Sequence, residues 1–78
     1  MNRDEILAKL TAVFRDVFDD ENIIVNENTT AEDIEGWDSL THVSLITEVE
    51  SVFKYKFSMK DVLGMKNIGE MIDLLAKG

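Results

Sequence analysis

The sequence contains no cysteine and no proline among its 78 residues. Without cysteine, the chain has neither disulfides nor a thiolate metal site, and any thiol chemistry has to come from a group added to the protein. The absence of proline suits a helical domain with few rigid turns. At this length one hydrophobic core is near the lower limit that sustains a fold, so we expect residues 1–78 to form a single small domain.

Basic residues are also few. Eight lysines and arginines stand against sixteen acidic residues, which gives a net charge of -8. Such a charge argues against nucleic acid and anionic membranes and favours basic surfaces on partner proteins, although it also serves plain solubility. No apolar run approaches membrane-spanning length, and the first residues do not form a signal-peptide pattern. We therefore expect a cytoplasmic protein with no stable membrane insertion.

The spacing of the apolar residues predicts three main helices and one short helix. They are expected over residues 3–18, 39–53, 59–63 and 68–77. A residue that favours the helix N-cap precedes each of them: Asn2, Asp38, Ser58 and Asn67. The fold class is therefore all-α, and a small helical bundle is the natural packing of these elements.

A long connection, residues 19–37, separates the first two helices. Thr30 followed by Asp33 is typical of a short capped turn, with Ile34 pointing inward. We expect the apolar residues 23–25 to anchor the connection on the bundle. Connections of this length are unusual in a compact domain and are often functional.

The connection ends in Gly36-Trp37-Asp38-Ser39-Leu40. Asp38 is suited to accept hydrogen bonds from the free N–H groups of the following helix. Ser39 then occupies the first helical position, where its hydroxyl is exposed. The positive end of the helix dipole favours a phosphate attached to that hydroxyl.

This arrangement resembles the modification site of acyl carrier proteins, in which an Asp-Ser-Leu serine carries a phosphopantetheine arm. The resemblance extends over the order and spacing of all the helices. It implies that a phosphopantetheinyl transferase attaches the arm covalently to Ser39. The arm then holds acyl groups as thioesters for acyl-transferring or acyl-activating enzymes. It also implies that Asp38 helps to hold the metal ion of the transferase and that Leu40, with Trp37 and His42, belongs to the docking surface of a monomeric carrier.

Other functions are compatible with the same residues. An aminoacyl or peptidyl carrier uses the same arm, and an interaction module without modification has the same composition. Ser39, His42 and Asp38 superficially suggest a hydrolase, but one helical turn supplies neither an oxyanion hole nor a cleft. We therefore expect no catalytic residue and no enzyme activity, with His42 an exposed helix residue. The acidic residues 19–21 do not follow the EF-hand pattern, so no metal site is expected.

Six apolar residues are expected to point inward and line a pocket for an acyl chain between the helices. They are Val43, Ile46, Val49, Val62, Met65 and Met71. A plain hydrophobic core is the alternative interpretation of the same six positions.

The charges near Ser39 differ from those of the carriers of fatty-acid synthesis, which the resemblance would otherwise suggest. Thr41, His42 and Ser44 stand where that type is strongly acidic, and three lysines follow further along: Lys56, Lys60 and Lys66. Trp37 replaces the small residue that is common before Asp-Ser-Leu. These departures favour a stand-alone carrier of a specialised lipid or polyketide pathway, with partners other than the fatty-acid enzymes.

Overall fold

A computed structural model describes residues 2–77 of the chain, and within them there are helices but no strands. In order these are α1 (Arg3–Val17), a 3-10 turn (Ala31–Asp33), α2 (Ser39–Phe53), α3 (Met59–Gly64) and α4 (Ile68–Lys77). The expected all-α bundle of three main helices and one short helix is thereby confirmed. No helix within residues 2–77 has the length and apolar character needed to cross a membrane.

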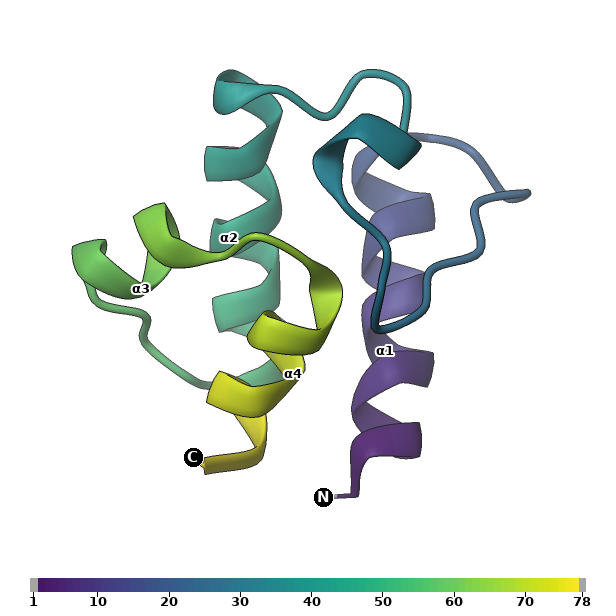
Figure 1. Ribbon diagram of the computed structural model, residues 1–78. Helices are drawn as coiled ribbons and strands as arrows, with labels where there is room; N and C mark the ends of the chain where they lie inside the picture. The colour runs from purple at the N-terminus through teal and green to yellow at the C-terminus, as the bar shows by residue number, and fades with distance from the viewer. Residues whose placement is uncertain (1, 78) are drawn as a thin grey trace.

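Helix α1 packs against both α2 and α4. In Figure 1, α1 and α2 stand side by side, α4 lies between their lower ends, and α3 lies on the outer side of α2. The long connection after α1 runs back along that helix and then returns to the top of the bundle, where α2 begins. The start of α2 is thus placed at one end of the molecule, at the exit of the connection.

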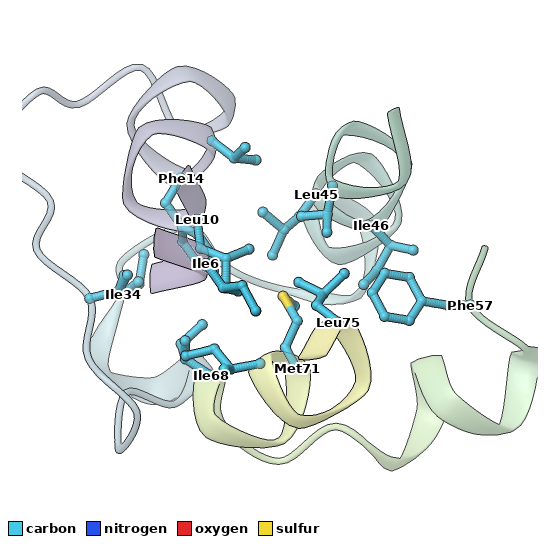
Figure 2. Close-up of a cluster of buried hydrophobic side chains, with 14 residues drawn as sticks. Ile6, Leu10, Phe14, Ile34, Leu45, Ile46, Phe57, Ile68, Met71 and Leu75 are labelled. Atoms are coloured by element: carbon cyan, nitrogen blue, oxygen red, sulfur yellow. The ribbon is translucent and has the colours of Figure 1, made fainter. Parts of the chain in front are cut away.

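The core forms where the apolar faces of the three main helices meet, as the close-up in Figure 2 shows. Its fully buried side chains are Ile6, Leu10 and Phe14 from α1, Leu45 and Val49 from α2, and Ile68, Met71 and Ile72 from α4. Each set recurs at three- or four-residue steps, which is the period that turns one face of a helix inward. The apolar residues whose spacing predicted α1 and α4 are therefore the ones that the bundle buries.

Buried apolar residues and backbone hydrogen bonds attach the long connection to the bundle. Val25 is 3% exposed and Ile34 is 8% exposed, so both act as apolar anchors, whereas Ile24 is 77% exposed and the expectation that it anchors the connection is wrong. The backbone N–H of Ile68 donates to the carbonyl of Thr29 at 3.0 Å, and that of Gly69 donates to Glu27 at 2.8 Å. The connection thereby satisfies N–H groups at the start of α4 that have no partner inside that helix.

The segment between α2 and α3 also has specific local interactions. Lys54 adopts a left-handed conformation (φ 53°) and ends α2. The Glu50 carboxylate accepts from the N–H of Phe57 at 2.8 Å, and the Phe57 ring is buried. Ser58 caps α3 by accepting from the N–H of Asp61 at 3.1 Å. These contacts fix the position of the short helix relative to α2.

Candidate functional site

The start of α2 is held by a reciprocal capping arrangement between Asp38 and Thr41. Oδ1 of Asp38 accepts from the N–H groups of Leu40 and Thr41, both at 3.0 Å. In return, the N–H of Asp38 donates to Oγ1 of Thr41 at 2.7 Å, and that hydroxyl donates to the carbonyl of Gly36 at 2.8 Å. The turn and the first helical residues are thus locked together, as the N-cap prediction for Asp38 required.

The same contacts determine the charge of Asp38. The hydrogen bond from the Thr41 N–H, together with those from the Thr41 hydroxyl and the Leu40 N–H, lowers the pKa of the Asp38 carboxyl below its ordinary value. The carboxylate is therefore ionised at neutral pH. The N–H groups of Leu40 and Thr41 both donate to the same carboxylate oxygen, Oδ1. Because Asp38 is an exposed residue, its second carboxylate oxygen is open to an approaching group.

Ser39 is the first residue of α2 and is exposed, as predicted. Its hydroxyl lies at the positive end of the helix, where the first N–H groups have no partner inside the helix. An anionic group attached to this oxygen is favoured electrostatically at that position. The site therefore presents a hydroxyl whose surroundings suit a phosphate ester.

Trp37 anchors the turn that precedes Ser39. Gly36 allows the turn because its backbone adopts a left-handed conformation (φ 88°), which residues other than glycine rarely adopt. The Trp37 ring then meets Phe14 of α1 edge-on, with ring centroids 5.1 Å apart, and approaches Phe18 at 6.5 Å. Trp37, which was predicted to belong to the docking surface, is therefore partly buried and fastens the turn to α1.

His42 takes part in a second contact with Trp37. The indole Nε1–H of Trp37 donates to Nδ1 of His42 at 3.0 Å, and the rings stack with centroids 5.9 Å apart. On its other side, Nε2 of His42 lies 3.4 Å from the carbonyl oxygen of Val62 in α3. The expectation that His42 is exposed is wrong, because the ring fills the space between the turn and α3 and is half-buried.

The contacts of His42 also bear on the hydrolase interpretation. A serine hydrolase requires a hydrogen bond between the nucleophile and a histidine nitrogen. Here the two ring nitrogens of His42 face Trp37 and Val62. Neither of these contacts involves Ser39, so the geometry does not support activation of its hydroxyl by His42.

An open groove of about 380 Å³ begins at Ser39 and extends between the start of α2 and α3. Its lining consists of Ala31, Trp37, Asp38, Ser39, His42, Val62, Leu63, Met65 and Lys66. Sequence reasoning missed Ala31, Leu63 and Lys66 as groove residues, because they come from segments that the fold alone brings to Ser39. The groove thus brings apolar surface from Trp37, Val62 and Met65 next to Ser39.

The six residues expected to point inward separate into three groups. Val62 and Met65 line this groove. Ile46, Val49 and Met71 are 6%, 0% and 1% exposed and belong to the core. Val43 is 62% exposed, so the expectation that it points inward is wrong. The face of α2 that meets α1 and α4 carries Leu45, Ile46 and Val49, and Val43 lies outside this arc.

Apolar side chains remain exposed on both helices that border the groove. Leu40 and Val43 of α2 are 81% and 62% exposed, and Met59 and Leu63 of α3 are 72% and 79% exposed. Exposed apolar residues on neighbouring elements are typical of surfaces that contact partners.

Between residues 2 and 77, no group of three or more histidine and acidic side chains is arranged to hold a metal ion.

Together, the fold and the site define a small helical carrier domain, with a serine at the exposed start of a helix and a groove beside it. Residues 8–75 match the sequence family of the phosphopantetheine attachment site. The chain therefore belongs to this family and bears a covalently attached phosphopantetheine. Comparison with curated protein sequences gives no significant match.

A solved structure supports the same assignment. The chain is similar to the holo acyl carrier protein from Geobacter metallireducens, determined in solution by NMR, with 43% sequence identity and a TM-score of 0.86. The similarity covers 92% of this chain and 83% of that chain. The bundle thus has the fold of an acyl carrier protein. Carriers of this type are typically not enzymes and interact with the enzymes that modify them or handle their acyl groups.

Proposed function

We propose that Ser39 is the residue that bears the phosphopantetheine arm. The observation that carries this proposal is the position of Ser39, exposed as the first residue of α2 and at the rim of the groove. The helix start favours the negative charge of the phosphodiester. The accessible oxygen of Asp38 is in place to help hold the divalent metal of a phosphopantetheinyl transferase. Because the chain has no cysteine, the thiol of the arm is its one thiol.

We propose further that the cargo is an acyl group, held as a thioester on this thiol. Trp37, Val62 and Met65 contribute apolar surface to the groove, and burying an acyl chain against them is favourable. The domain itself performs no chemistry: it presents the tethered cargo at high effective concentration to acyl-activating and acyl-transferring enzymes. In this role residues 1–78 act as one carrier domain and as a monomer.

The first experiment tests the attachment residue. The protein without its arm is incubated with coenzyme A and a broad-specificity phosphopantetheinyl transferase, and the intact mass is measured. We expect the mass to increase by one phosphopantetheine in the wild type and not in Ser39→Ala. Far-UV circular dichroism should be unchanged in this variant, because an exposed hydroxyl contributes little to packing.

Ser51→Ala is the matched control, since Ser51 is also an exposed serine of α2. This variant should gain the full mass. Modification that persists in Ser39→Ala would show that another residue carries the arm.

A second experiment tests the cargo. The transferase is used to load arms that already carry acyl groups of increasing chain length, and the melting temperature is compared with that of the form bearing a free arm. We expect the melting temperature to rise with chain length as the chain covers the groove. Met65→Ala, which removes a lining side chain, should reduce this rise, and Met59→Ala on the exposed side of α3 should not. A rise of equal size with a polar aminoacyl group would contradict an acyl cargo.

A further inference from the structure

We propose that His42 is a positioning residue for the modification of Ser39: its neutral ring fastens α3 to the turn that presents the serine, and protonation of the ring breaks its hydrogen bond to Trp37 in that turn. This inference rests on the proposed role of Ser39. It assigns no chemical step to His42, which acts through Trp37 on one side and the α3 backbone on the other.

The geometry connects three elements through one side chain. Trp37 lies in the turn before α2, His42 lies in the first turn of α2, and Val62 lies in α3. The two nitrogens of the imidazole face the indole N–H at 3.0 Å and the Val62 carbonyl at 3.4 Å. All three residues line the groove that begins at Ser39. The ring therefore bridges the two walls of the groove beside the modified position.

The donors and acceptors define the protonation state that this bridge requires. The indole N–H of Trp37 only donates, so Nδ1 of His42 has to be without a proton. The neutral ring then carries its proton on Nε2, from which it donates to the Val62 carbonyl. A proton added to Nδ1 would place two donors opposite each other and leave the half-buried indole N–H without an acceptor. Acid thus breaks the contact with Trp37 specifically and leaves the contact with α3 possible.

Two charged side chains line the groove together with the ring. Among the residues that line the groove with His42, the charged ones are Asp38 from the turn and Lys66 from the connection between α3 and α4. The groove residues of α3, Val62 and Leu63, are uncharged. Trp37 itself packs against the aromatic rings of Phe14 in α1 and of Phe18, the C-cap of that helix. Imidazole is the side chain that ordinarily changes charge in the weakly acidic range, whereas carboxylates and lysines do so well outside it.

Two substitutions of His42 separate the two contacts. In His42→Asn the side-chain oxygen takes the place of Nδ1, so the acceptor for Trp37 is retained without a titrating group. In His42→Gln the amide nitrogen takes the place of Nε2, so the donor to the Val62 carbonyl is retained and the acceptor for Trp37 is lost. Far-UV circular dichroism at each pH establishes that all forms remain folded.

The first measurement follows the indole N–H of Trp37 and the ring of His42 by NMR between about pH 8 and about pH 5. It uses the unmodified protein and does not depend on the role of Ser39. We expect the indole resonance of the wild type to shift with the same midpoint as the His42 ring. The indole resonance of His42→Asn should not shift, and that of His42→Gln should be displaced at every pH. An indole resonance that ignores the titration of His42 would overturn the proposal.

The second measurement is the rate of mass gain with coenzyme A and the transferase, for wild type and His42→Asn at each pH. The rate of the wild type divided by that of His42→Asn cancels the response of the transferase itself to pH. We expect this ratio to fall about threefold or more from about pH 8 to about pH 5, which corresponds to the loss of one modest hydrogen bond. A ratio that stays constant while the indole shifts would overturn the positioning role. A wild type that gains no mass at any pH would instead overturn the proposed role of Ser39, and the positioning role of His42 with it. The hydrogen bond between Trp37 and His42 is tested separately, by the titration of the indole resonance.

Discussion

The ring of Trp37 stands nearly perpendicular to that of Phe14, with an angle of 79° between the ring planes and 5.1 Å between their centroids. Edge-to-face pairs of this kind add stabilisation beyond that of the buried area. Phe14 is fully buried in α1, whereas Trp37 lies two residues before Ser39. The position of the serine-bearing turn is therefore coupled to the central core of the bundle.

This coupling is measurable with a double-mutant cycle. We expect Trp37→Leu and Phe14→Leu each to lower the free energy of unfolding by about 1–3 kcal/mol, because each removes buried aromatic surface. The double variant should lose about 0.5–1.5 kcal/mol less than the two single losses combined. Urea unfolding followed by circular dichroism measures all four proteins. Additive losses would show that the two rings do not interact energetically.

Gly69 provides a second prediction. From helix propensity alone, Gly69→Ala should stabilise the first turn of α4. In the structure, a Cβ at this position would lie 2.9 Å from the carbonyl oxygen of Glu27. We therefore expect the substitution to lower the free energy of unfolding by about 1–3 kcal/mol, as overpacking does.

Gly64→Ala is the control for this prediction, because a Cβ there meets nothing within 4 Å. It should stabilise the protein by up to about 1 kcal/mol. The same urea experiment compares the two variants. If both alanines stabilise, the close approach between α4 and the long connection is not a constraint.

The cap of α2 makes stability dependent on pH in a defined direction. Asp38→Asn retains an oxygen that caps the helix and removes the negative charge. Because the pKa of Asp38 is lowered in the folded protein, its charge stabilises the fold above the ordinary aspartate range, near about pH 4, and this contribution is lost as the pH falls through the lowered value. The melting temperature of the wild type should therefore exceed that of Asp38→Asn at pH 7, and the difference should vanish in strong acid. Ser58→Ala, which removes an uncharged cap, should give a difference that is independent of this titration.

Arg3 joins three segments of an acidic protein. Its guanidinium binds the carboxylate of Glu27 in the long connection and that of Asp73 in α4, the latter at 2.6 Å. The hydrogen bonds that Arg3 donates to Glu27 also hold the pKa of the Glu27 carboxyl below its ordinary value. Removing the guanidinium leaves these two carboxylates near each other without a cation.

We therefore expect Arg3→Gln to lower the melting temperature most at low ionic strength, with a deficit that narrows as salt screens the repulsion. The wild type should also gain from salt, since its net charge is -8. Lys60→Gln makes the same change in net charge on an exposed residue of α3 and serves as the control. An equal effect of the two substitutions would mean that net charge, and not the local cluster, determines the salt response.

Partner choice should depend on the exposed positions of α2. Thr41 and His42 stand where the fatty-acid type of carrier is acidic, but the structure uses both inside the site, in the cap and in the contact with Trp37. Ser44 and Thr47 are exposed polar residues of the same helix that do not take part in the site. A charge change that leaves the site intact belongs at these two residues.

We expect the modified wild type to be a poor substrate for fatty-acid elongation enzymes with basic docking patches. The double change Ser44→Glu and Thr47→Glu should raise the rate of acyl transfer about tenfold at low salt and less at high salt, because charges at the rim of an interface act mainly on association. Ser51→Glu, further along the same helix, is the control. A double variant without any gain at low salt would show that charge on α2 does not select the partner.

The sequence by itself determined the helices and the position of the serine. The caps at Asn2, Asp38 and Ser58 appear where they were predicted, because each cap is a contact between residues two or three apart in the chain. The charge of the protein is likewise a property of composition alone.

Only the tertiary structure decided which predicted residues meet. Val43 and Ile46 have similar apolar side chains on one helix, and their different burial depends on which face of α2 is covered by α1 and α4. His42 is half-buried because α3 brings the Val62 carbonyl to it, and Gly69 is required because the long connection crosses its backbone. Such contacts join residues twenty or more positions apart, so they depend on how the elements pack and not on the spacing within any one of them.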